Sequence, residues 1–147
     1  MAKTQPDIQI FNETDSTLPL EQSDFTKIAS SIAHNEDCTF RFIEVVYVDE
    51  QEIIRINKEH LERDYITDII TFRYDDSSDN SAIEGTLFCC TPRIREQAEE
   101  FNESPEREFS RILIHGLLHL IGYDDRTETQ KIEMTTKEDT YLKVLQL

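Results

Sequence analysis

The sequence predicts one domain of the α+β or α/β class, with four strands and about five helices. Its 147 residues suit a single hydrophobic core, because two cores would be thin at this length. Short segments rich in β-branched and aromatic residues alternate with segments in which apolar residues recur at helical spacing. Capping patterns mark the starts of the helices in the last third. These observations indicate a single domain over residues 1–147, without internal repeats.

Strand-like and helix-like segments alternate through the first ninety residues. β-branched and aromatic residues predict the strands, whereas apolar residues three and four apart, such as Phe25, Ile28 and Ile32, predict the helices. The polar segment 75–85 is expected to be a loop, followed by a fourth strand at 85–91. The elements expected before that loop are a strand at 7–11, a helix at 21–36, a strand at 38–49, a helix at 49–61 and a strand at 67–74.

The last third is expected to be helical. A helix at 91–101 opens with Thr91 as its cap and a proline at the first helical position. A helix at 104–122 opens in the same way with Ser104 and stops at a glycine. A capping box at 127–130 opens a last helix that runs to the C-terminus. The apolar residues expected to face the core from this last helix are Ile132, Leu142 and Leu145.

A large excess of acidic residues is the most unusual global property. The chain has 31 Asp and Glu against 15 Lys and Arg, a formal net charge of −16. Such a charge repels nucleic acid at long range, so composition alone argues against a polyanionic partner. No apolar run approaches the roughly 20 residues of a membrane span, and the first residues lack an apolar signal core. With Cys38, Cys89 and Cys90 interpreted as small buried thiols, a cytosolic protein without a membrane partner is expected.

The segment HGLLHLIGYDD, residues 115–125, is the strongest functional signal. Residues four apart on a helix lie about 5 to 6 Å apart on one face, so His115 and His119 can point at a common centre. The helix stop at Gly122 lets the chain return toward that face, where Asp124 or Asp125 can supply a carboxylate. Two imidazoles and one carboxylate match the three protein ligands of catalytic zinc sites. Of the two acids, Asp125 is the predicted third ligand.

A histidine pair at this spacing is also compatible with a purely structural role, which is the commoner case. Three features favour a metal: half of the four histidines lie here, the helix stops at a glycine, and acids follow at once. The chemistry differs from that of the H-E-x-x-H zinc peptidases, because Gly116 stands where their general-base glutamate would be. Asp124 or a metal-bound hydroxide would have to act as the base.

Arg111 lies one helical turn before His115 and is a candidate for binding an anionic substrate. An ion pair between Arg111 and Glu108, worth a few tenths of a kcal/mol, is an equally good interpretation of the sequence.

Segment 115–125 resembles the H-G-x-L-H-L-x-G-Y-D-H signature of the YbeY family, single-domain metal-dependent endoribonucleases involved in ribosomal RNA maturation. The resemblance extends to INKEHLERDYITDIITF at 56–72, which is similar to a family segment ending in T-D-V-L-S-F. It continues more loosely through EGTLFCCTPRIREQA at 84–98 and EMTTKED at 133–139. Together these segments cover about the last two-thirds of the chain, in the family's order.

The resemblance implies an α+β fold: a mixed four-stranded sheet with a zincin-like, metal-bearing helix packed under it. It assigns one divalent ion to His115, His119 and Asp125, where the family usually has a third histidine. A carboxylate makes the centre less positive, so water bound there should be less acidic than at a three-histidine site. Zinc is the expected ion, and iron(II), manganese and nickel remain compatible with these ligands.

Leu61 is a second departure, because many family members have an arginine there that is proposed to matter for activity. Arg63, two residues further on, either substitutes for that arginine or is an ordinary solvated loop residue.

The resemblance implies an endoribonuclease that hydrolyses RNA phosphodiester bonds with a metal-activated water, in maturation of the 16S rRNA 3′ end and ribosome quality control. The implied partners are ribosomal RNA, the ribosomal subunit, ribosomal proteins and assembly GTPases. Arg111 or Arg63 would steady phosphate charge, and Asp124 is the candidate base. Nine of the fifteen basic residues are arginines, which either form a basic cleft or lie scattered among acids. Two other functions fit the ligand pattern: a non-catalytic ribosome-assembly factor with a structural metal, and a 2-His-1-carboxylate iron oxygenase.

Overall fold

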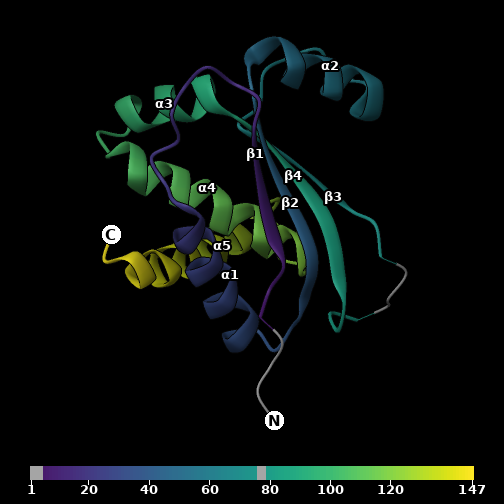
Figure 1. The fold of residues 1–147 in the computed structure, drawn as a ribbon, viewed down its shortest axis with the longest axis vertical. Coiled ribbons are helices and arrows are strands. Elements are labelled where there is room, and N and C mark those ends of the chain that lie inside the picture. The colour runs from purple at the N-terminus through teal and green to yellow at the C-terminus, as the bar shows by residue number, and fades with distance from the viewer. Residues whose placement is uncertain (1–4, 76–78) are drawn as a thin grey trace.

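A mixed four-stranded sheet forms the centre of the fold (Figure 1). The computed structural model describes residues 5–75 and 79–147. The strands lie in the order β1-β2-β4-β3, with β1, β2 and β4 parallel and β3 antiparallel to β4. The mixed α+β fold with four strands is therefore confirmed. The strands are β1 (Ile8–Asn12), β2 (Phe40–Val48), β3 (Ile69–Arg73) and β4 (Ile83–Cys90).

Successive side chains of β2 point to opposite faces of the sheet, and helices pack on both faces, although α2 reaches only one end of the second face. Val45 and Tyr47 pack into the large core formed with α1, α3, α4 and α5, whereas Val46 and Val48 pack with Ile53 of α2 on the opposite face. None of the helices in the described residues is long and apolar enough to cross a membrane. The five helices described are α1 (Gln22–Asn35), α2 (Glu50–Leu61), α3 (Thr91–Glu100), α4 (Pro105–Leu120) and α5 (Glu128–Leu142), and a short 3₁₀ helix follows at Lys143–Leu145.

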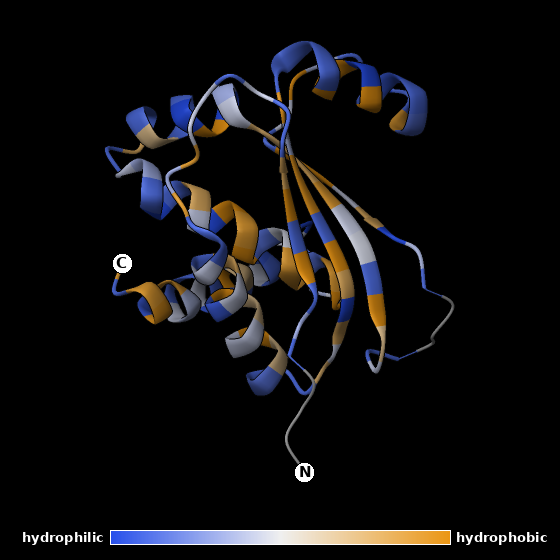
Figure 2. Ribbon diagram, viewed as in Figure 1, coloured by the Kyte–Doolittle hydropathy of each residue, from blue (hydrophilic) through white to orange (hydrophobic). Residues whose placement is uncertain are grey.

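Helix α4 packs directly against the sheet. Figure 2 shows hydrophobic segments along α4 and along the strands that it covers. The approach is close because Gly116 has no side chain: a Cβ atom there would lie 2.6 Å from Cδ1 of Ile69 in β3 and 3.1 Å from Cδ1 of Leu87 in β4. A second glycine lets β3 and β4 approach, since a Cβ atom on Gly85 would lie 2.5 Å from the carbonyl oxygen of Phe72.

The predicted elements are all present, and four details differ. Strand β4 begins at Ile83, inside the segment expected to be a loop, while residues 76–78 of that segment lie outside the described part of the chain. The N-cap of α3 is Cys90 and not Thr91, because β4 continues into the helix without a linker. Ile132 is 66% exposed, because it lies two residues, about 200°, from the core-facing Met134. The last helix ends at Leu142, before the C-terminus.

Glu36 joins α1, the turn after α4, and α5. Its carboxylate accepts hydrogen bonds from the Tyr123 hydroxyl (2.6 Å), from Lys137 Nζ (3.0 Å) and from the Tyr141 hydroxyl. Burial opposes ionisation of Glu36, but these three hydrogen bonds outweigh it and hold the pKa of the carboxyl below its usual value. The ionised carboxylate therefore stabilises the junction between these elements.

We predict that Glu36→Gln lowers the free energy of unfolding by about 2 kcal/mol at pH 7, as expected for hydrogen bonds to a charged group. Because the folded-state pKa lies below the ordinary value of 4.5, this stabilisation is present above that pH and is lost as pH falls through the folded pKa. Urea unfolding should show a smaller difference in the free energy of unfolding between wild type and Glu36→Gln at pH 3 than at pH 7. The exposed Glu133→Gln removes the same charge and serves as control. An equal difference at both pH values would contradict the prediction.

We predict that Gly85→Ala lowers the free energy of unfolding by about 1–3 kcal/mol, because the new methyl group meets backbone that cannot rotate away. Gly116→Ala should lower it by less than about 1 kcal/mol, because the terminal carbon of Ile69 can move and alanine favours the helix. Urea unfolding of both variants measures the difference. Equal losses would show that α4 cannot relax at Gly116.

Candidate metal centre

The last two turns of α4 carry both histidines of the predicted centre. His115 and His119 lie on one face, with their ring centroids 4.6 Å apart. The chain then reverses at Gly122, whose φ of 115° is in the region that glycine adopts without strain. The Tyr123 amide donates to the Leu118 carbonyl (3.0 Å) and closes the turn. This reversal brings the chain back along the histidine face.

The returning chain places the Asp125 carboxylate against both imidazoles. Its two oxygens lie 3.5 Å from His115 Nε2 and 3.7 Å from His119 Nε2. Ligand atoms bound to a tetrahedral zinc ion are about 3.4 Å apart, so these spacings fit a shared ion. One ligand atom from each of the three residues lies within 4.8 Å of the others, and all three residues are partly exposed. The residues present thus fit a divalent ion with three protein ligands and an open side.

Glu138 of α5 orients the first histidine. Its Oε2 lies 2.7 Å from His115 Nδ1, and its side chain is only 8% exposed. A proton held on Nδ1 by this carboxylate would leave Nε2, which lies 3.5 Å from an Asp125 oxygen, free to bind a metal, as in many metal-bound histidines. Burial disfavours the His115 imidazolium, but the Glu138 hydrogen bond and the charges of Glu138 and Asp125 raise the pKa of His115 above its usual value.

Arg111 supports Glu138. Its guanidinium lies 3.1 Å from Glu138 Oε1 and 3.3 Å from Asp139 Oδ1, both on α5, and 3.9 Å from Glu108 Oε1. The ion pair between Arg111 and Glu108 that the sequence suggested is therefore present, but its distance is the longest of these three. Arg111 contacts Glu138, and Glu138 contacts His115. Arg111 therefore reaches the predicted centre only through Glu138.

A cleft passes over the three predicted ligands. One cavity of about 320 Å³ and another of about 290 Å³ share His115, Asp125 and Asp68 in their walls. The first cavity extends toward Phe101 and Lys131, and the second toward the loop after α2. A substrate chain lying in both cavities would cross the open side of the centre.

Of the remaining predicted residues, Arg63 lines the cleft and Asp124 does not. Arg63 and Leu61 line the second cavity, and the Arg63 guanidinium lies 5.9 Å from the Tyr65 ring centre. Asp124 lines a different cavity, of about 420 Å³, together with Glu36. Its carboxylate accepts the Asp125 amide (2.8 Å) and pairs with Arg126, so it stabilises the turn instead of facing the histidines.

Two carboxylates of the site were missed in the sequence. Glu138 lies within the family-like segment 133–139, but its contact with His115 spans 23 residues. Asp68 lies in the family-like segment before β3 and lines both cavities. Burial raises the pKa of Asp68 above its usual value, although the charge of His115 opposes this. Each residue lies in a family-like segment, but only the packing of distant elements brings it to the site.

The arginines of α3 and α4 do not form a basic cleft. Arg93 pairs with Glu96 and Glu100, and Arg107 pairs with Glu103. Arg95 binds Ser16 and Thr17 instead. Among the described residues, the cations that line the cleft are Arg63, Arg111 and Lys131.

Comparisons with known proteins identify the family of this chain. A family model described as Endoribonuclease YbeY matches residues 9–146. A relative of that description from Chlorobium limicola is 40% identical over 135 residues, which cover 92% of this chain and 90% of the relative. One from Chloroherpeton thalassium is 39% identical over 126 residues, 86% and 87% of the two chains. A solution structure from Thermotoga maritima superposes with a TM-score of 0.61 at 26% identity, covering 94% of this chain and 88% of that chain.

We predict that Glu138→Gln weakens zinc binding by about 10–100-fold, because a neutral amide orients and polarises His115 less well. Competition with a chromogenic chelator measures the dissociation constant. Asp139→Asn is the matched control, since it removes a neighbouring charge that pairs with Arg111 without contacting His115. Equal losses in the two variants would assign the effect to general electrostatics.

Proposed function

Because the chain belongs to the YbeY family of endoribonucleases, we propose that it is a metal-dependent endoribonuclease that acts in ribosomal RNA maturation. The observation that carries this proposal is the convergence of His115, His119 and Asp125 in an open cleft, within the segment that matches the family. The protein is then a single metal-dependent hydrolase domain over residues 1–147, and its substrate is the RNA phosphodiester bond.

The proposed ligands are His115 and His119 through Nε2 and Asp125 through a carboxylate oxygen, with zinc as the expected ion. When bound, a divalent ion supplies Lewis-acid chemistry that polarises a phosphoryl oxygen and makes water a better nucleophile. Glu138 holds His115 in the tautomer that leaves Nε2 free, and Arg111 holds Glu138.

Other residues of the cleft would bind phosphate and accept a proton. Arg63 steadies phosphate charge from the second cavity, in place of the family arginine whose position is occupied by Leu61. Asp68 is better placed than Asp124 to accept a proton, because Asp68 lines the cleft and Asp124 lines another cavity. Arg111 contributes through Glu138 rather than by binding phosphate directly.

Ribosomal RNA, including the 3′ end of 16S rRNA, is the proposed substrate, with roles in ribosome maturation and quality control in the cytoplasm. A chain of net charge −16 repels RNA at long range. Few cations line the cleft, so binding must rely on local contacts and on protein partners, such as ribosomal proteins or assembly GTPases, that bring the RNA close. Binding through the few cleft cations should weaken as salt rises.

A non-catalytic ribosome-assembly role is the second candidate. Leu61 at the family arginine position and the local pairing of Arg93 and Arg107 favour it, because both leave few cations for phosphate. In that case a metal would only hold the last two helices together.

We predict that zinc-loaded protein cleaves single-stranded 16S rRNA fragments, and that chelation stops cleavage. His119→Ala and Asp125→Ala should lower cleavage and zinc content, the rate by more than about 100-fold, because loss of an outer partner alone costs 10–100-fold. His34→Ala, an exposed histidine on α1, is the control. A clean wild type that binds zinc and gains thermal stability from it, yet cleaves no RNA, would favour the assembly role.

We predict that Asp125→His retains the metal and shifts the activity optimum to lower pH. Three neutral imidazoles leave the centre nominally +2 instead of +1, so a nearby water loses its proton more easily. A pH–rate profile and elemental analysis of both proteins measure this. Loss of metal from Asp125→His would show that Asp125 is not the third ligand.

A further inference from the structure

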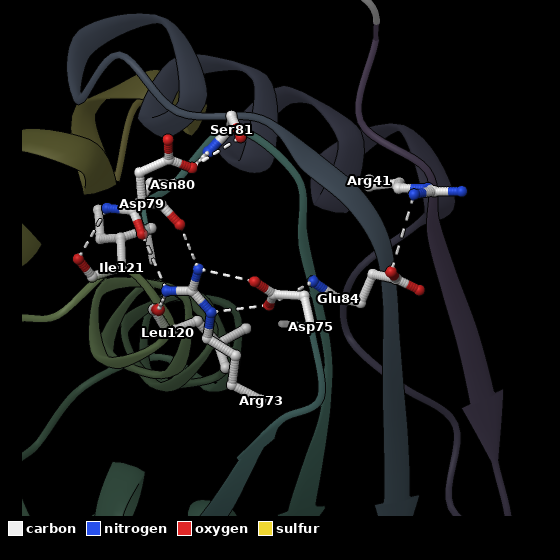
Figure 3. A network of polar contacts seen from close by, with 9 residues as sticks. All are labelled: Arg41, Arg73, Asp75, Asp79, Asn80, Ser81, Glu84, Leu120 and Ile121. Atoms are coloured by element: carbon white, nitrogen blue, oxygen red, sulfur yellow. Dashed lines mark hydrogen bonds and ion pairs between the residues drawn. The ribbon is translucent and has the colours of Figure 1, made fainter. Parts of the chain in front are cut away.

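Arg73 at the end of β3 and Asn80 shortly before β4 are bound to the C-terminal end of α4 (Figure 3). The last carbonyl groups of any helix lack partners within it. Here the amides of residues 121–123 bond to the carbonyls of residues 117–119. The next two carbonyls, those of Leu120 and Ile121, accept hydrogen bonds from the side chains of Arg73 and Asn80.

Arg73, the last residue of β3, is the centre of this contact. Its Nη1 donates to the Leu120 carbonyl (2.9 Å) and to Asn80 Oδ1 (2.8 Å). Its Nε and Nη2 bind both oxygens of Asp75, at 2.7 and 3.0 Å, and Nη2 also donates to the Asp79 carbonyl (2.6 Å). A cation here also interacts favourably with the negative end of the helix dipole.

Asn80 extends the contact by one residue. Its Oδ1 accepts from Arg73, and its Nδ2 donates to the Ile121 carbonyl at 3.0 Å. Asp75 in turn accepts the Glu84 amide of β4 at 3.1 Å, which ties the arginine to the sheet. Arg73 and Asn80, called the α4 clamp below, therefore fix two successive carbonyls where the chain leaves the helix.

The turn held by the clamp leads directly to Asp125. From the other side, the same turn is held by the hydrogen bond of Tyr123 to Glu36. The Asp125 side chain is 43% exposed, so packing does little to place it and its position follows from the backbone. A rotation of the peptide planes at residues 120 and 121 would therefore move its carboxylate away from the histidines.

We propose that Arg73 and Asn80 are positioning residues of the metal centre: by binding the Leu120 and Ile121 carbonyls, they direct the turn that places Asp125 opposite His115 and His119. This inference rests on the metal site of the proposed function. It assigns a role in that site to two residues that are not themselves predicted ligands.

The test uses the full chain, with Zn²⁺ and Co²⁺ as probes. Arg73→Met and Asn80→Ala should each weaken zinc binding, by about tenfold for Arg73→Met, at the lower end of the range for outer partners of a metal site. Arg73→Met should also change the visible spectrum of the Co²⁺ protein and speed exchange of the Tyr123 amide in metal-free protein. Arg73→Lys keeps a cation and a donor, and should recover part of the affinity.

Two controls separate positioning from general stability. Arg41→Met makes the same substitution at a 69% exposed arginine that pairs with Glu84 at 4.0 Å and does not contact α4 (Figure 3). Ile28→Val removes a buried methylene group from α1 and weakens the core without changing any polar contact of the turn. Both should leave zinc affinity and the Co²⁺ spectrum unchanged at a temperature where every variant is folded.

The outcomes distinguish this inference from the proposed function. A wild type that binds neither ion would overturn the metal site and the inference together. A wild type that binds zinc, with Arg73→Met binding it equally well and showing the same Co²⁺ spectrum, would overturn the inference alone. A loss in Ile28→Val as large as that in Arg73→Met would also overturn it, because the effect would then follow stability.

Discussion

The close packing of α4 against β3 and β4 is the contact on which the rest of the site depends. It is possible because Gly116 allows the helix to touch Ile69 and Leu87, and it sets how far along β3 the helix lies. That position brings the histidine face of α4 next to the start of β3, where Asp68 forms part of the cleft wall. The H-E-x-x-H peptidases have a glutamate at the position of Gly116, and its side chain would not fit between α4 and the sheet. Gly116 therefore accounts both for the close packing and for the absence of that base.

Carboxylates dominate the electrostatics of the centre. Asp125 is a carboxylate where the family signature has a histidine, and Glu138 places a second carboxylate behind His115. Arg111 offsets part of this charge through Glu138. The centre therefore favours a cation strongly but attracts the anionic RNA backbone weakly. The proposed RNA substrate would therefore need other surfaces to supply affinity.

Local information in the sequence predicts the fold and the ligand cluster well. The strands, the helices and the capping box at Thr127 follow from side-chain type and short-range spacing. The convergence of His115, His119 and Asp125 is likewise contained in eleven residues. By contrast, Glu138, Asp68 and Arg73 contact residues that are more than twenty positions away in the sequence. Local periodicity does not predict such contacts. Ile132 and the proposed phosphate role of Arg111 illustrate the same limit, since both depend on how α5 is rotated against α4.

The ligand set and its supports differ in when they become available during synthesis. All three predicted ligands leave the ribosome within eleven residues of one another, after the whole sheet has been made. Glu138 emerges thirteen residues after Asp125, as part of α5. A nascent chain ending before α5 therefore already contains the ligands, but His115 lacks the carboxylate that orients it. At the proposed metal centre, tight binding would therefore depend on completion of the C-terminal helix, and a truncated or stalled chain would hold an ion poorly.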